Sequence, residues 1–130
     1  MILRNPTTLH NPLAAYSHQA EVDGNAKWLV MSAQVGMDKD GYVPDDVYAQ
    51  TKIAMGNIML NLYAAKMSKE NLVKLTFYFV GSHDILRRRD IVNNALGDHK
   101  PCMTVIYVAG LATPDLKVEI DAWAVKADAR

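Results

Sequence analysis

Several classes of protein require residues that this sequence lacks. Its 130 residues include one cysteine, Cys102, so neither an internal disulfide nor a multi-cysteine metal site can form. No apolar run approaches the roughly 20 residues that cross a bilayer. Residues 1–11 lack the basic-then-apolar pattern of an export signal. We therefore expect a cytoplasmic protein that does not associate with membranes.

An excess of one charge is also missing. Fourteen Lys and Arg residues balance 14 Asp and Glu residues, which gives a formal net charge of zero. Proteins that hold a phosphate backbone usually carry a basic excess, so the composition argues against a nucleic-acid partner. The histidines His10, His83 and His99 are scattered, and none forms a metal-ligand pair such as His-x-x-x-His. We expect no metal site and no cofactor.

The apolar content, in contrast, is sufficient for a core. Half of the residues are apolar and 22% are charged, close to the globular average. No repeat, low-complexity tract or linker divides the chain. We therefore expect a single domain that spans residues 1–130.

The spacing of apolar residues predicts the element order β-β-α-β-α-β-β. Strands are expected at residues 16–23, 27–35, 72–80, 102–109 and 117–126, and a short strand at residues 2–4 is an additional option. Helices are expected from an Asp N-cap at residues 45–46 to about residue 67, and from about residue 83 to residue 96. A turn at Asp23-Gly24-Asn25 would join the first two main strands into a hairpin.

Two of the expected strands, 27–35 and 102–109, are apolar on both sides, and the second has the pattern of a buried strand. Two helices can cover one face of such a sheet but hardly both. The other face would expose an apolar patch, which soluble monomers avoid, so we expect self-association through it. Alternation places polar residues on this same face, which suggests a cleft between subunits: Lys74, Thr76, Tyr78, Glu119 and Asp121.

Four segments, in order along the chain, resemble the RidA (YjgF) family of enamine/imine deaminases. They are Ala15-Tyr16-Ser17-His18, Met31-Ser32-Ala33-Gln34-Val35-Gly36, Val73-Lys74-Leu75-Thr76 and Lys117-Val118-Glu119-Ile120-Asp121-Ala122. The resemblance implies an α+β, chorismate-mutase-like fold with two helices packed on one face of the sheet. It also implies a homotrimer with small-molecule clefts between subunits. In deaminating members of the family, an amino-acid-derived imine is hydrolysed to a 2-keto acid and ammonia.

One position departs from the family pattern. The family arginine that binds the substrate carboxylate stands in a Pro-x-Arg-Ser/Thr motif, and the matching run here is Pro101-Cys102-Met103-Thr104. Met103 therefore occupies the arginine position. A thioether cannot replace a guanidinium fork, and charge-assisted hydrogen bonds contribute about 1.5–3 kcal/mol each. The chain thus resembles an arginine-lacking branch of the family, with little or no activity expected on the usual 2-imino acids.

The resemblance assigns roles to three other residues, and alternation adds His18. Glu119 matches the glutamate that positions the hydrolytic water and could act as a general base, although an ion pair with Lys74 is the structural alternative. Tyr16 and Ser32 match residues that line the cleft, and each could instead serve packing or backbone hydrogen bonding. Alternation places His18 on the side of Tyr16, where it could act as acid or base, or be a surface histidine.

The sequence has one basic cluster, Arg87-Arg88-Arg89, on the second expected helix. A solvated face is the favoured interpretation, and the alternatives are anion binding or a replacement anchor for a substrate carboxylate. Cys102 is expected to be an inert core thiol, because nothing in the sequence places a basic partner against it.

Three functions remain open. The first is a trimeric hydrolase that acts on an enamine, imine or related small molecule between subunits. The second is a non-catalytic trimer that binds a small metabolite, which the missing arginine favours. The third is a ribonuclease, a label attached to some family members, which the zero net charge makes the weakest of the three.

Overall fold

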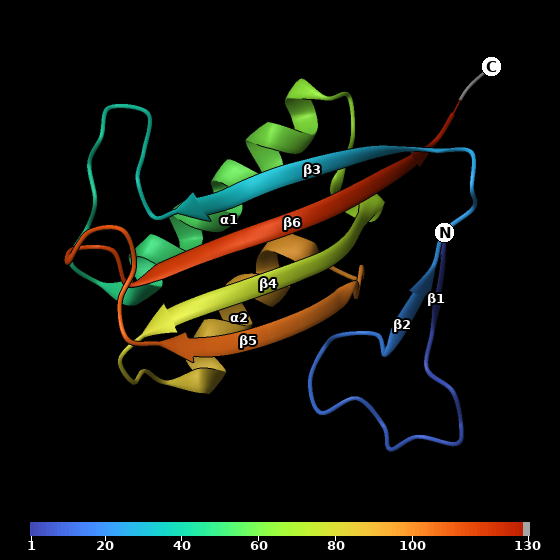
Figure 1. The fold of residues 1–130 in the computed structure, drawn as a ribbon. Helices are drawn as coiled ribbons and strands as arrows, with labels where there is room; N and C mark the ends of the chain where they lie inside the picture. The colour runs from blue at the N-terminus through green and yellow to red at the C-terminus, as the bar shows by residue number, and fades with distance from the viewer. Residues whose placement is uncertain (129–130) are drawn as a thin grey trace.

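The computed structural model describes residues 1–128 and follows the predicted element order (Figure 1). The elements are β1 (Ile2–Arg4), β2 (Gln19–Glu21), β3 (Ala26–Val35), α1 (Val47–Ala64), a short 3-10 helix η1 (Lys69–Asn71), β4 (Leu72–Val80), α2 (Ile85–Leu96), β5 (Cys102–Val108) and β6 (Val118–Ala127). Within residues 1–128, neither α1 nor α2 is long and apolar enough to cross a membrane.

Aspartates cap both helices, as the sequence predicts for α1. The backbone N–H of Ala49 donates to Oδ2 of Asp46 at 3.1 Å. In α2, the N–H groups of Leu86 and Arg87 donate to Oδ1 of Asp84. These bonds satisfy N–H groups that have no partner inside a helix. At the other end, Gly97 adopts a positive φ of 60° and terminates α2.

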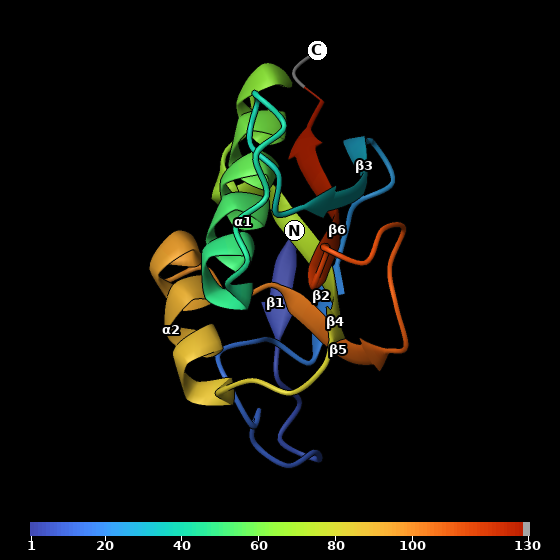
Figure 2. The ribbon, with the colours of Figure 1, turned by 90° about the vertical axis from the view of Figure 1, so that its left-hand side faces the viewer.

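The main sheet has four strands in the order β3-β6-β4-β5. The β4–β5 pair is parallel and the other pairs are antiparallel (Figure 1). Because β5 comes last in the strand order, it forms one edge of the sheet. Both helices lie on the same side of this sheet, which confirms the predicted arrangement (Figure 2). The opposite side, called the open face below, has no helix against it.

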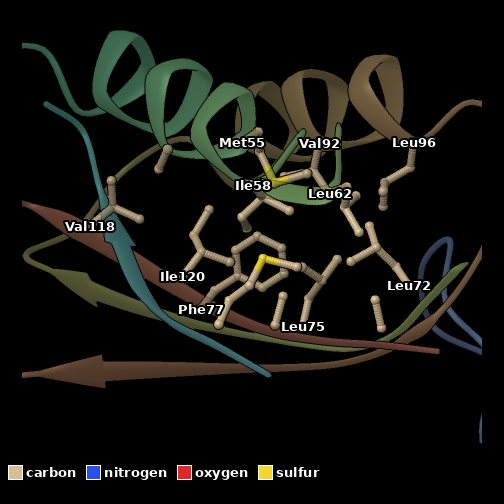
Figure 3. Packing of buried hydrophobic residues seen from close by; sticks show 14 of the residues in the cluster. Met55, Ile58, Leu62, Leu72, Leu75, Phe77, Val92, Leu96, Val118 and Ile120 are labelled. Atoms are coloured by element: carbon tan, nitrogen blue, oxygen red, sulfur yellow. The ribbon is translucent and has the colours of Figure 1, made fainter. Parts of the chain in front are cut away.

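The core lies between the helices and the covered face of the sheet (Figure 3). Alternate residues of β4 point into it, because Leu75, Phe77 and Phe79 are at most 2% exposed. Burial of each such side chain contributes about 1.5–3 kcal/mol to folding. The helices contribute the facing residues of this core: Met55, Ile58, Leu62, Val92 and Leu96.

The open face carries the predicted polar group. Strand pairing sets the β4 residues Lys74, Thr76 and Tyr78 beside β6 residues of the same face, among them Asp121 and Glu119. The Tyr78 hydroxyl donates to Oδ2 of Asp121 at 3.1 Å. The alternation argument therefore placed these side chains correctly.

Apolar side chains share the open face with this polar group. Trp28, Val30 and Trp123 are 47%, 58% and 44% exposed, and the two indole rings meet edge to face at 5.7 Å. Exposed tryptophans of this kind are characteristic of surfaces that bind another molecule.

Three details of the prediction are wrong. The strand expected at residues 16–23 is reduced to β2, and Tyr16 and His18 precede it. The turn at Asp23 forms, but β2 pairs with β1 and β3 pairs with β6, so there is no hairpin. β5 is not a buried strand, because an edge strand has one neighbour and its central residues are exposed.

A buried glutamine joins α1 to the loops at the end of the sheet. The Gln50 amide Nε2 donates to the carbonyl oxygens of Pro44 and Asp115 at 2.7 and 2.9 Å, and its Oε1 accepts from Lys117 N at 2.8 Å. Gln50 is fully buried, so no water molecule can reach these backbone groups and pair with them in place of the amide. This clasp fixes the chain two residues before Glu119.

We expect Gln50→Leu to lower the free energy of unfolding by at least about 2 kcal/mol, because it leaves buried backbone groups unpaired. Urea denaturation measures the change. Gln34→Leu, at a half-buried position where the amide bonds only the nearby Ser32 carbonyl, is the control and should cost less. Equal losses in the two variants would contradict the role of the clasp.

Candidate functional site

A pocket of about 390 Å³ opens between α2, the covered side of β5 and the N-terminal loop. Its wall is mostly apolar, as is typical of small-molecule sites. The strands contribute Phe77, Met103, Val105 and Tyr107. The loop contributes residues 13–16, and α2 contributes Ile85, Arg88, Arg89, Val92 and Asn93.

The N-terminal loop is fastened to the body of the protein at Ser17. The Ser17 hydroxyl donates to the carbonyl of Lys100 at 2.6 Å, and its backbone N–H donates to the carbonyl of Pro101 at 3.3 Å. Ser17 is only 7% exposed. These two bonds hold the neighbouring Tyr16 close to the first residues of β5, where it lines the same pocket as Met103.

The structure brings two of the five predicted site residues into this pocket, namely Tyr16 and Met103. His18 lies nearby, with its ring centroid 5.8 Å from that of Tyr16, but it does not line the pocket. The His18 Nε2 instead lies 2.8 Å from the carbonyl oxygen of His10.

The other two predicted site residues lie elsewhere in the chain. Glu119 is on the open face, on a strand that β4 separates from β5. Ser32 is exposed in the irregular stretch of β3 between Met31 and Gln34. Within residues 1–128, a single chain therefore does not assemble the complete predicted site.

The arginine cluster is not a uniformly solvated face, so the favoured interpretation is wrong for Arg88. Arg87 is exposed, with its guanidinium 4.0 Å from the centre of the Tyr48 ring. Arg88 is only 7% exposed. Its Nη1 lies 3.3 Å from Nε2 of His83 and 3.4 Å from the Tyr107 hydroxyl.

The sequence held a signal for this burial. Position 88 falls three residues after Ile85 and four before Val92, on the apolar stripe of the predicted helix. Tyr107 was missed as well, although it shares the alternation of Met103 along β5.

His83 occupies an aromatic pocket beside Arg88. Its ring lies 4.5 Å from the Phe79 ring and 5.8 Å from the Tyr107 ring. Burial, and secondly the charge of Arg88, lower the pKa of His83. The neutral ring can accept at Nε2 from Arg88, which leaves the proton on Nδ1, a buried atom that has no hydrogen-bond partner among residues 1–128.

Two further groups on the open face have shifted pKa values. The hydrogen bond to Asp121 raises the pKa of Tyr78, with burial and the nearby Glu119 carboxylate adding to the effect. Burial raises the pKa of the Cys102 thiol, which favours the inert interpretation. Cys102 is half-buried beside Lys74, however, and is not a core residue as the sequence predicted. Within residues 1–128, no three His, Cys, Asp or Glu side chains gather as a metal site.

Comparison with known proteins identifies the family. The sequence profile described as "Endoribonuclease L-PSP" matches residues 8–126. A RutC family protein of Pyrococcus horikoshii is 32% identical over 117 residues, which cover 88% of this chain and 90% of that protein. The TdcF protein of Escherichia coli, named as a reactive intermediate deaminase, is 27% identical over 89 residues, or 66% of this chain and 68% of that protein.

The fold agrees with these relatives. The crystal structure of YyfB, a Rid family protein from Yersinia pestis, superposes with a TM-score of 0.84 at 26% identity, over 95% of this chain and 96% of that one. Two helices on one face of a mixed sheet are thus the shared architecture. The chain belongs to the RidA (YjgF) family.

The neutral state of His83 predicts a pH dependence of stability. Because the folded pKa is lowered below 6.5, the unfolded chain binds the extra proton first, so stability is present above pH 6.5 and falls as the pH drops below it. Thermal unfolding between pH 5 and 8 measures this effect. We expect the stability of the wild type to fall more than that of His83→Phe over this range. Parallel curves would contradict the assignment.

Proposed function

We propose that this protein is a homotrimeric, RidA-like hydrolase of an enamine, imine or related small metabolite, with each site completed by a second copy of the chain. The division of the predicted residues between two surfaces carries this proposal. Tyr16 and Met103 line the pocket, whereas Glu119 lies on the open face of the same chain. A second copy would supply the Glu119 carboxylate at the open side of the pocket.

The exposed apolar surfaces support this assembly. Trp28, Val30 and Trp123 on the open face, and Val105 and Tyr107 at the rim of the pocket, are between 39% and 58% exposed. Contact between copies would remove these side chains from water, which is the main driving force for stable association.

The chemistry follows from what a carboxylate can do beside an apolar pocket. Glu119 would take a proton from water as the oxygen attacks the carbon of the C=N group. Glu119 would pass this proton to the nitrogen, which gives an amino alcohol. The hydroxyl proton would then be transferred to the nitrogen in the same way, the C–N bond would break to release ammonia, and the carbon would become a carbonyl.

Met103 restricts which substrates this site can use. A thioether contributes neither charge nor a hydrogen-bond donor at the position where the family pattern has arginine. Activity on the usual short 2-imino acids should therefore be weak or absent, whereas a less polar imine would fit the wall around Met103.

The trimer makes a direct prediction for solution behaviour. Sedimentation velocity should give about 43 kDa for three copies of the 14.4 kDa chain. Val30→Lys on the open face should shift the protein toward the monomer, because it places a charge in the contact. Leu60→Lys, at an equally exposed site on α1, should leave the trimer intact. A monomeric wild type at micromolar concentration would refute the assembly.

Catalysis can be tested with imines generated in the reaction vessel by an amino-acid oxidase or an amine oxidase, with keto-product formation followed over time. Glu119→Gln should lower the enzyme-dependent rate about 100-fold, since it removes the general base and preserves shape. Glu70→Gln, a fully exposed glutamate, is the matched control. Equal rates in Glu119→Gln and wild type would remove Glu119 from the mechanism.

A non-catalytic binding trimer is the second candidate, and Met103 in place of arginine is the observation that favours it. The same imine panel separates the two functions when it is combined with thermal shift. A ligand that raises the melting temperature without turnover would indicate binding alone. RNA cleavage abolished by a point mutation in the pocket would instead support a ribonuclease.

A further inference from the structure

Arg88 is a buried cation without a buried anion. Its side chain is 7% exposed, and it makes no salt bridge within residues 1–128, where the ion pair present joins Arg4 to Glu21. A charge removed from water is costly unless an opposite charge or several hydrogen bonds compensate for it. His83 supplies no opposite charge, because its lowered pKa keeps the ring neutral, and its contact with Arg88 is a single hydrogen bond of 3.3 Å.

The guanidinium has unused hydrogen-bonding capacity. A guanidinium carries five N–H donors in a planar fork. The Arg88 contacts with His83 and Tyr107 both use Nη1 and are long, at 3.3 and 3.4 Å. The Phe79 ring adds a cation–π contact at 5.3 Å. Within residues 1–128, Nε and Nη2 of Arg88 make no hydrogen bond, and neither atom is fully enclosed, so this edge of the fork is accessible to a ligand.

The unused edge belongs to a residue that lines the pocket. Arg88 shares the pocket wall with Val92, Val105 and Met103, which offer no competing acceptor. A carboxylate matches the fork in charge and geometry, and the apolar wall strengthens the attraction by lowering the local dielectric constant.

We infer that Arg88 is the anion anchor of this pocket and binds the carboxylate of a small organic acid whose apolar tail packs against Val92 and Val105. This inference rests on the pocket of the proposed function and specifies the class of its ligand. The anchor comes from α2 instead of β5.

The position of the anchor restricts the acids that react. Arg88 contacts Tyr107 near the end of β5, whereas Met103 lies near its beginning. Four residues separate these positions, roughly 13 Å along the strand. An arginine at position 103 would hold a short 2-imino acid near the beginning of β5. Arg88 would hold the same acid near the end of β5, so its imine carbon would lie in a different place. Carboxylate binding and weak turnover of short 2-imino acids are thus compatible.

The first test uses the wild-type protein alone. Titration calorimetry compares 4-methyl-2-oxopentanoate with its neutral amide, which has the same apolar tail. We expect the acid to bind about 10- to 100-fold more tightly than the amide, as charge-assisted hydrogen bonds to a fixed guanidinium would give. Equal affinities, or no binding of the acid, would overturn the inference. That outcome is also expected if a carboxylate of a second copy already occupies Arg88.

The second test assigns the effect to one arginine. Arg88→Gln should remove the preference for the acid over the amide, and Arg88→Lys should restore only part of it, because an ammonium lacks the fork. Arg87→Gln removes the same charge one residue away and should preserve the preference. An equal loss in Arg87→Gln would show general electrostatics, and an effect of Arg89→Gln in place of Arg88→Gln would assign the anchor to Arg89. Either result would overturn the inference.

The outcomes remain distinct from those of the proposed function. Binding is measured without turnover, so an Arg88-dependent preference for the acid would stand even if no imine is hydrolysed. Conversely, imine hydrolysis that depends on Glu119, without a preference for acids over amides, would support the proposed function and contradict the role of Arg88. If Arg88→Gln fails to fold, the comparison of acid and amide with the wild type still decides.

Discussion

A four-stranded sheet with helices on one side only is the constraint on which the rest of this structure depends. The covered side holds a conventional core built on Leu75, Phe77 and Phe79. The open face combines tryptophans with a carboxylate group around Tyr78. This face exposes more apolar surface than is usual for a monomer, and its polar groups distinguish it from a second core. It therefore suits a contact between copies that encloses polar groups.

The same constraint explains how one chain can hold an incomplete site. The pocket belongs to the covered side, because α2 and the inward residues of β5 form it. Glu119 belongs to the opposite side, because consecutive residues of a strand point to opposite faces. No rotation of a side chain within one chain can bring the two together. If Glu119 acts at this pocket, as proposed, the alternation along β6 requires that it come from a second copy of the chain.

Patterns within a short stretch of sequence predicted the structure well. Residues 72–80 alternate strictly and became β4 at the expected bounds, and an aspartate caps α1 as predicted. Pairing between distant segments was less predictable. The turn at Asp23 is present, but nothing local shows that β2 pairs with β1, because strand partners are chosen by the whole fold.

The site shows the same division. The helical spacing that predicts a buried Val92 applies equally to position 88, but the charge of arginine favours solvent exposure and conceals the signal. Only the packing of His83, Tyr107 and Phe79 around the guanidinium reveals that it is enclosed. Buried charges of this kind are difficult to infer from sequence, because the compensating groups are distant in the chain.

The fastening of the N-terminal loop has a thermodynamic consequence. One side of the pocket is a segment outside the main sheet, held to the start of β5 by the two hydrogen bonds of Ser17. Any molecule that touches both this segment and α2 bridges two separate parts of the chain. Occupancy and the docking of the segment are then coupled equilibria, so each must strengthen the other by the same free energy. Resistance of the first 20 residues to proteolysis would thereby report how full the pocket is.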